Sequence, residues 1–223
     1  MEKQGRCTVD VPTKFQHPNN VFIIHTAPDA SYARNIEDLA KIDAKDVCKD
    51  LKTRMAGKSW VSLRSLCRIF AAMDDGSGQL EEDDFRWGLI DLGLQLSKEE
   101  CSELCSKFGG GKINYADFLN ELRGSCNAER MEVIKACFAK INVNGTVKLD
   151  DIAQAFDVAN HIDLDKRTER DVFMEFMSLW ANQDKDALVS EKEFCDYMED
   201  ISGLIDSNTD FKTVMNNAWK CCE

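Results

Sequence analysis

Proline is nearly absent from this chain of 223 residues, and its three prolines, Pro12, Pro18 and Pro28, all lie near the start. A long stretch without proline is typical of a chain built mainly from helices, because proline breaks the interior of a helix. The sequence therefore divides into two regions. Residues 1–45, with six basic and six acidic residues, are expected to form an extended arm without a core of its own. Residues 46–223 are expected to be helical.

Long apolar runs are also lacking, and none approaches the ~20 residues that a membrane-spanning helix needs. The chain has no apolar signal core after Met1, Glu2 stands where N-myristoylation requires glycine, and the end that begins at Lys220 is not a CaaX box. Lys and Arg number 28 against 40 Asp and Glu, which gives a net charge of −12. A chain this acidic repels phosphate backbones and anionic lipids. We expect a cytoplasmic protein that binds neither nucleic acid nor a membrane.

Catalytic motifs are missing as well, since the chain contains no nucleophile elbow and no zinc-protease sequence. The run from Gly109 to Lys112 is similar to part of a phosphate-binding loop. However, Ser106 and Ile113 occupy the positions where that motif requires glycine and Ser or Thr. The sequence predicts that the protein is not an enzyme.

The ten cysteines include no C-x-x-C pair, and the three histidines do not complete a zinc-ligand spacing. Cys101 and Cys105 are four residues apart, a spacing that fits one face of a helix. We expect the cysteines to be reduced thiols, several of them in the core. The adjacent pair Cys221–Cys222 leaves acylation or redox chemistry open.

Four similar units follow one another after residue 46, each with an apolar helix, a short polar loop, a β-type residue, and an acidic residue followed by an apolar one. The β-type residues are Leu80, Ile113, Val147 and Val189, and the acidic residues are Asp84, Asp117, Asp151 and Glu193. Repeated helix–loop–helix units of this kind are typical of EF-hands, which fold in pairs. The sequence therefore predicts an all-α fold of four EF-hands in two pairs, in which the β-type residues of paired loops face each other.

The first pair is expected within residues 46–125, after a leader helix, and the second within residues 126–223, before a C-terminal helix. A capping box, Ser97-x-x-Glu100, is expected to begin the second unit. Aromatic side chains at helical spacing are expected in the core: Trp60, Phe70, Phe85, Trp87, Phe118, Phe138, Phe156, Phe173, Phe176, Trp180, Phe194 and Trp219.

Three of the four loops depart from the pattern that binds Ca²⁺, in which oxygens come from positions 1, 3, 5, 7, 9 and 12 and glycine occupies position 6. In the first loop (74–84), either Met73 takes position 1 with a thioether too soft for Ca²⁺, or Asp74 does and the loop is one residue short. The second (109–117) lacks carboxylates in its first half, and the third (142–151) is two residues short. We expect both to be inactive, with weak Ca²⁺ or Mg²⁺ binding left open for the first.

The fourth loop, residues 182–193, fits the pattern best. Its predicted ligands are Asn182, Asp184, Asp186, the carbonyl of Leu188, Ser190 and Glu193. Ala187 stands at position 6, where a left-handed backbone would cost roughly 1 kcal/mol. The sequence predicts a weak Ca²⁺ site, with a dissociation constant on the order of 10⁻⁵ to 10⁻³ M. The alternative is an acidic turn without metal.

The order of motifs from residue 46 onward resembles calcyphosine and calcyphosine-like EF-hand proteins. The residues that carry the resemblance are Leu51…Arg54-Met-Ala-Gly57…Leu66-Cys-Arg-Ile-Phe70, Asp84-Phe85-Arg86-Trp87-Gly88-Leu89, Ala139-Lys140, Phe194-Cys-Asp-Tyr197 and Asp210-Phe211…Trp219. The resemblance implies two EF-hand lobes in one body, no enzyme activity, and a role in calcium signalling, with relatives prominent in ciliated cells.

Two hypotheses follow for the function. In the first, a structural interaction protein uses the arm (1–45) and the basic segment 46–73, whose net charge is +4, to contact tubulin or other proteins of the ciliary axoneme. The basic segment also fits an ordinary solvated helix face. In the second, a calcium sensor binds Ca²⁺ through its fourth EF-hand and regulates a target protein.

Overall fold

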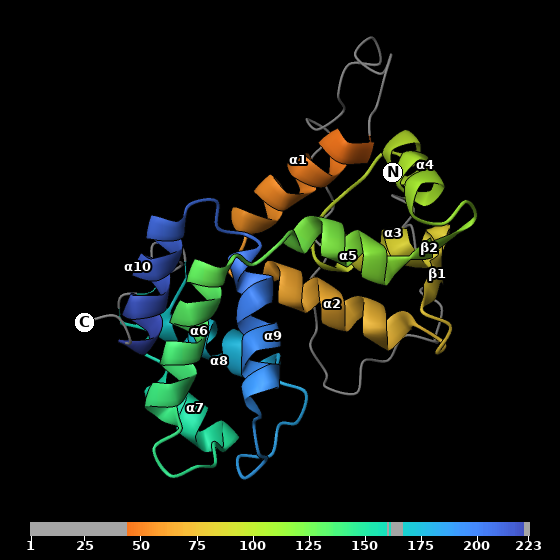
Figure 1. Cartoon of the computed structure of the whole chain (residues 1–223). Helices are drawn as coiled ribbons and strands as arrows, with labels where there is room; N and C mark the ends of the chain where they lie inside the picture. Colours follow the sequence, from red (N-terminus) through yellow and green to blue (C-terminus); the bar gives the residue numbers. More distant parts are fainter. Residues whose placement is uncertain (1–43, 160, 162–166, 221–223) are drawn as a thin grey trace, which may run out of the picture. The chain divides into compact units, whose positions relative to one another are not determined.

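The computed structural model describes residues 44–159, 161 and 167–220, and this part of the chain contains ten helices and one two-stranded sheet (Figure 1). The predicted all-α class is confirmed. The elements are α1 (Ala44–Ala56), α2 (Ser62–Met73), β1 (Gln79–Glu81), α3 (Glu82–Asp91), α4 (Lys98–Phe108), β2 (Lys112–Asn114), α5 (Tyr115–Arg123), α6 (Ala128–Ile141), α7 (Leu149–Ala155), α8 (Glu169–Ser178), α9 (Glu191–Ser202) and α10 (Asn208–Trp219). Most of the predicted arm and the pair Cys221–Cys222 lie outside the described residues.

The first pair of helix–loop–helix units is joined by the small sheet. Strands β1 and β2 are antiparallel, and Leu80 lies opposite Ile113, as predicted. The predicted capping box is also confirmed, because the Ser97 hydroxyl accepts the Glu100 N–H while the Glu100 carboxylate accepts the Ser97 N–H. These local contacts fix the start of α4 and the pairing of the first two loops.

The second pair is joined by a single β-bridge between Lys148 and Leu188. The Val189 N–H donates to the Val147 carbonyl at 2.8 Å, and the Leu149 N–H donates to the Ala187 carbonyl at 2.9 Å. This antiparallel register places Val147 opposite Val189, which confirms the predicted pairing.

Two hydrophobic clusters fill the interior of the described part. The first is built from residues of α1–α5 and their loops, with Leu204 added, and the second from residues of α6–α10, with Trp60 and Val61 added. We call the elements around these clusters the first lobe (α1–α5, β1 and β2) and the second lobe (α6–α10). Leu204, which follows α9 of the second lobe, is buried in the first cluster, and Trp60 and Val61, which precede α2 of the first lobe, are buried in the second. The two lobes therefore share buried surface. The predicted domain limits at 45/46 and 125/126 stay predictions.

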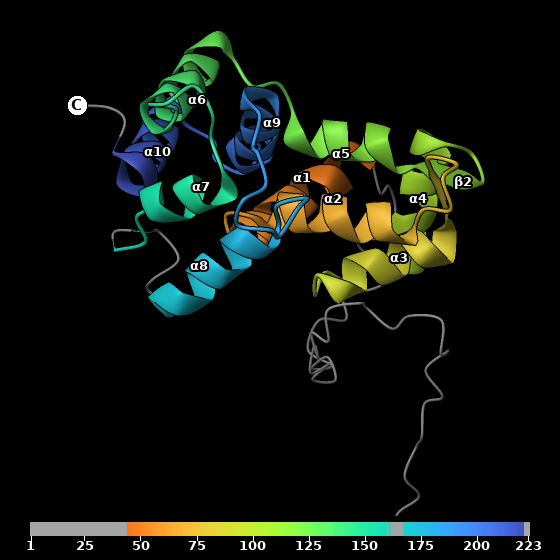
Figure 2. The same cartoon turned by 90° about the horizontal axis from the view of Figure 1, so that it is seen from below.

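A buried carboxylate connects the lobes where α2 contacts α9 (Figures 1 and 2). The Asp200 side chain on α9 is only 1% exposed, and it pairs with Arg64 of α2 at 3.2 Å and Arg123 of α5 at 2.7 Å. Nearby, Arg68 of α2 donates to the carbonyl of Trp180 at 2.7 Å, just beyond the end of α8. We call these contacts the Asp200 junction.

Gly203, directly after α9, allows the close approach of chain that the Asp200 junction needs. A Cβ atom at this position would lie 2.8 Å from the carbonyl oxygen of Arg123. Glycine is therefore required here for space, since its backbone conformation is an ordinary right-handed one.

Two expectations about buried side chains are wrong in part. Ten of the twelve predicted core aromatics are buried, but Trp87 is 57% exposed and Phe173 is only partly buried. Phe85 and Leu89 define the buried face of α3, so Trp87 falls on its opposite side. Of the described cysteines, six are free as predicted, whereas Cys137 is disulfide-bonded.

Among the described helices, none has the length and apolar character needed to cross a membrane.

Candidate metal centre

The first loop is closed by hydrogen bonds to Asp74, the residue that follows α2. Its carboxylate accepts the N–H groups of Gly76 and Gly78 at 3.1 Å, and the Tyr115 hydroxyl donates to it at 3.1 Å from the second unit. Met73 instead packs against the first hydrophobic cluster. Of the two frames open from the sequence, the structure favours the one in which Asp74 takes position 1 and the loop is one residue short.

A lysine from the second loop lies beside the acidic residues of the first. The Lys112 ammonium pairs with Glu81 at 2.8 Å. Its pKa is raised, first by that hydrogen bond and charge and further by the charges of Asp75 and Asp84. A fixed cation at this place repels a divalent ion, so it opposes metal binding to the first loop.

The second lobe repeats this arrangement with Lys148 of the third loop. Its ammonium lies 2.8 Å from a carboxylate oxygen of Asp186, the residue expected at position 5 of the fourth loop. The hydrogen bond and charge of Asp186 raise the pKa of Lys148, and the charges of Asp151 and Asp150 raise it further. These four side chains line part of a groove of about 360 Å³ between the third and fourth loops.

The other early ligands of the fourth loop hold the backbone of their own loop. The Asn182 side chain accepts the Asp184 N–H at 2.9 Å, and the Asp184 carboxylate accepts the Asp186 N–H at 3.0 Å. Leu188 forms the β-bridge with Lys148, and within the described residues no backbone N–H donates to its carbonyl. That carbonyl is therefore free of backbone donors, and its place as the ligand at position 7 stays a prediction.

At the end of the loop, Ser190 and Glu193 form a capping box that begins α9. The Glu193 carboxylate accepts the Ser190 N–H at 2.9 Å and the Ser190 hydroxyl at 2.8 Å. These two hydrogen bonds lower the pKa of the Glu193 carboxyl. Glu193 is thus ionised, and one of its two oxygens, Oε2, accepts both hydrogen bonds at the start of α9.

The predicted strain at Ala187 is not found. Among the described residues, Lys220 is the single non-glycine residue with a positive φ, so Ala187 does not take the left-handed conformation. Its N–H instead donates to the Asp184 carbonyl at 2.9 Å in a local turn. The loop therefore follows a different path at position 6, which avoids the cost of a Cβ atom there.

The predicted ligands of the fourth loop lie in sequence around one turn, but their carboxylates do not converge. In the part of the chain that the structure describes, the one group of three metal-ligating side chains within 4.8 Å of one another is Glu82, Cys101 and Cys105. In this geometry Lys148 engages one carboxylate oxygen of Asp186, and Ser190 engages one carboxylate oxygen of Glu193. Lys148 therefore competes with Ca²⁺ for one oxygen of Asp186, and the two donors of Ser190 compete with it for one oxygen of Glu193.

Sequence reasoning missed Lys148 as a functional residue. The predicted pairing of Val147 with Val189 would have been enough to place Lys148 opposite Leu188, on the fourth loop. Its contact with Asp186 joins two residues that are 38 positions apart in the sequence, and it depends on the conformation of the lysine side chain.

We expect Lys148→Met to raise the affinity of the protein for Ca²⁺ by about threefold to tenfold, because it removes a cation that competes for Asp186. Calorimetric titration of the full chain measures the change. Lys135→Met is the matched control, since it removes the same charge from an exposed position on α6. Equal affinities for wild type and Lys148→Met would show that the ion pair does not limit binding.

Four helix–loop–helix units, joined two by two through β-contacts between their loops, define an EF-hand protein. No protein-family model matches the chain. Crustacean calcium-binding protein 23 from Faxonius limosus is 30% identical over 183 residues, which cover 78% of this chain and 91% of that protein. The chain therefore belongs to the family of EF-hand calcium-binding proteins that includes this crustacean protein.

Plant kinases show a weaker similarity. Calcium-dependent protein kinase 19 of Arabidopsis thaliana is 25% identical over 76% of this chain, and calcium-dependent protein kinase 19 of Oryza sativa subsp. japonica is 27% identical over 61%. The matched regions are only 29% and 25% of the lengths of these kinases. The similarity thus concerns a part of each kinase, and it carries no kinase activity to this chain.

Proposed function

We propose that this protein is a non-enzymatic, calcium-responsive interaction protein whose fourth loop is its Ca²⁺ site. The fourth loop has the fullest set of oxygen ligands in the chain, with carboxylates at positions 3, 5 and 12. Similarity to calcium-binding relatives supports metal binding by this family. The finer resemblance to calcyphosine agrees with the proposal.

The observation that carries the proposal is that the chain on both sides of the fourth loop contacts helix α2. Helix α8 ends before the loop and α9 begins after it, and both are attached to α2 of the first lobe. Arg68 holds the carbonyl of Trp180, and Arg64 holds Asp200. If Glu193 moved to bind Ca²⁺, the first turn of α9 would shift with it. Because Asp200 on the same helix pairs with Arg64 of α2, such a shift would change the contact between the lobes. A response of this kind alters the surface that a target protein meets.

We expect Glu193→Gln to reduce Ca²⁺ affinity by at least about a hundredfold, because the bidentate carboxylate of position 12 is lost. Isothermal titration up to millimolar Ca²⁺ compares the variant with wild type. Glu191→Gln is the control, since it makes the same change in charge in the same turn of α9 without touching the capping box. Saturable heat that persists in Glu193→Gln, or none in wild type, would refute a site at the fourth loop.

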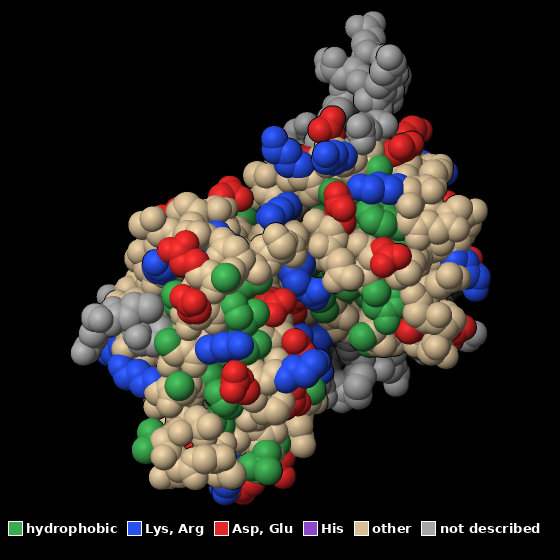
Figure 3. Space-filling model, in the orientation of Figure 1, with side chains coloured by type: hydrophobic (Ala, Val, Ile, Leu, Met, Phe, Trp, Pro, Cys, Tyr) green, Lys and Arg blue, Asp and Glu red, His purple; other side chains and the backbone are tan. Residues whose placement is uncertain are grey.

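The proposed contacts with tubulin or other axonemal proteins depend on the basic segment 46–73 and the arm. Residues 1–43 of the arm lie outside the described residues. Within the basic segment, Arg64 and Arg68 are used in the Asp200 junction and Arg54 pairs with Asp50, which leaves Lys49, Lys52 and Lys58 for an acidic partner. Lys49 and Lys52 line a groove of about 400 Å³ beside α1. Figure 3 shows basic and acidic side chains interspersed on one face of the molecule.

Co-sedimentation of the full chain with microtubules tests this part of the proposal. Lys49→Glu/Lys52→Glu should abolish binding if the segment meets the acidic surface of tubulin. The absence of sedimentation for wild type would remove tubulin as a partner.

A further inference from the structure

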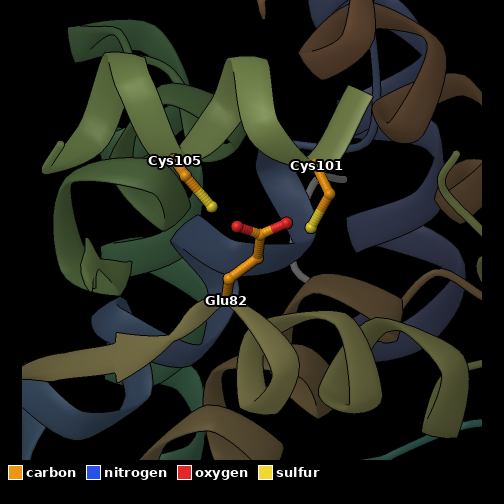
Figure 4. A group of neighbouring side chains, drawn as sticks. All are labelled: Glu82, Cys101 and Cys105. Carbon is orange, nitrogen blue, oxygen red and sulfur yellow. The ribbon is translucent and has the colours of Figure 1, made fainter. Parts of the chain in front are cut away.

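We infer that Glu82, Cys101 and Cys105 form a site in the first lobe for a thiophilic divalent cation of the Zn²⁺ class. The three ligand atoms, two sulfurs and one carboxylate oxygen, all lie within 4.8 Å of one another. Figure 4 shows both thiols of α4 directed toward the Glu82 carboxylate, which comes from the first residue of α3. The site shares no residue with the fourth loop, so it is independent of the proposed Ca²⁺ function.

The geometry suits tetrahedral coordination by three protein ligands. With bonds of about 2.3 Å to sulfur and 2.0 Å to oxygen, a tetrahedral Zn²⁺ places two sulfurs about 3.8 Å apart and a sulfur and an oxygen about 3.5 Å apart. The present separations, none of them above 4.8 Å, therefore need to contract by at most about 1.3 Å. Cys101 and Cys105 are one helical turn apart on the same face of α4, which fixes the two sulfurs relative to each other.

Burial of the ligands gives the site a closed inner side and an open outer side. Cys101 is fully buried and Cys105 is 6% exposed, whereas Glu82 is exposed. An ion can enter past the carboxylate, and water can complete the fourth position. Two thiolates select a soft or borderline cation, so Ca²⁺ and Mg²⁺, which prefer oxygen, are poor competitors.

Before metal binds, both cysteines are neutral thiols. Burial raises the pKa of Cys101 to about 12, and burial and the charge of Glu82 raise the pKa of Cys105. Binding is thus an exchange: Zn²⁺ forms two bonds to sulfur, each S–H bond breaks, and two protons leave to water. No oxidation or reduction takes place. The charge of Arg86 on α3 lowers the pKa of Cys101, against the larger effects that raise it.

The test uses the full chain, purified under reducing conditions and freed of metal. Titration with Co²⁺ should give one equivalent of binding and the near-ultraviolet absorption of thiolate-to-cobalt charge transfer. Zn²⁺ should displace the Co²⁺, while a millimolar excess of Ca²⁺ should not. The absence of a charge-transfer band in wild type would overturn the inference.

Substitutions of the three proposed ligands test which residues bind the metal. Cys101→Ser/Cys105→Ser should lose the absorption band, while Cys126→Ser/Cys195→Ser and Cys221→Ser/Cys222→Ser, the control variants, should keep it. Because serine at buried Cys101 can perturb folding, Glu82→Gln provides a second test at an exposed residue. We expect it to keep the thiolate band at saturation and to weaken Zn²⁺ binding by about tenfold or more. A band that is lost in either control, or Zn²⁺ affinity unchanged in Glu82→Gln, would contradict the assigned ligands.

Discussion

Asp200→Ala is expected to lower the free energy of unfolding by about 3 kcal/mol, because it removes the one carboxylate that holds Arg64 and Arg123 at the Asp200 junction. The loss comes mainly from the two guanidinium groups that remain partly buried without a counter-charge. Their side chains are 20% and 26% exposed, so water recovers part of the cost. Urea unfolding followed by far-ultraviolet circular dichroism measures the change.

The matched control for this prediction lies on the same helix. Asp196 of α9 is exposed and pairs with Lys192 one turn away, so Asp196→Ala removes the same charge at little cost. If the two variants were equally stable, the Asp200 junction would contribute no more than a surface ion pair.

Phe176→Ala should destabilise the protein by about 3–5 kcal/mol, since it leaves a large cavity in the middle of the second cluster. The Phe176 ring is fully buried and stacks on Phe156 with ring centres 4.1 Å apart. It also contacts Tyr197 at 5.0 Å, and the Tyr197 hydroxyl donates to the Phe176 carbonyl at 2.8 Å.

Met174→Ala serves as the control, because Met174 is on α8 too but is 57% exposed. Denaturant unfolding of both variants, with the slope of the transition compared as well as its midpoint, gives the measurement. A loss below about 1 kcal/mol for Phe176→Ala would mean that the cluster collapses around the missing ring.

The parts of the fold that could be predicted from sequence are those that depend on local spacing. The capping box from Ser97 to Glu100 is local, and both of its hydrogen bonds form. The pairing of Leu80 with Ile113 and of Val147 with Val189 follows from equivalent positions in paired loops, so the repeat alone determines it. Helical spacing would also have corrected Trp87, which lies two residues from buried Phe85.

The candidate site was harder to predict because its state depends on contacts between segments far apart in sequence. Counting positions identifies Asp186 and Glu193 as ligands, but it does not show that Lys148 occupies the first and Ser190 the second. Likewise, the spacing of Cys101 and Cys105 predicts a shared helix face, whereas their approach to Glu82 requires the packing of α3 against α4. Side chains from a partner element decide these features, and a single periodic pattern does not contain them.

The positions of the tryptophans allow the two lobes to be distinguished by fluorescence. Trp60, Trp180 and Trp219 are all buried in the second cluster, while the first cluster contains no tryptophan among its described residues. Trp87, on α3 of the first lobe, is exposed. A Trp87→Phe protein would therefore emit almost entirely from the second lobe, with the blue-shifted spectrum of buried indoles. In the unmodified protein, a water-soluble quencher such as iodide would reach Trp87 selectively, so the two lobes can be followed separately in one sample.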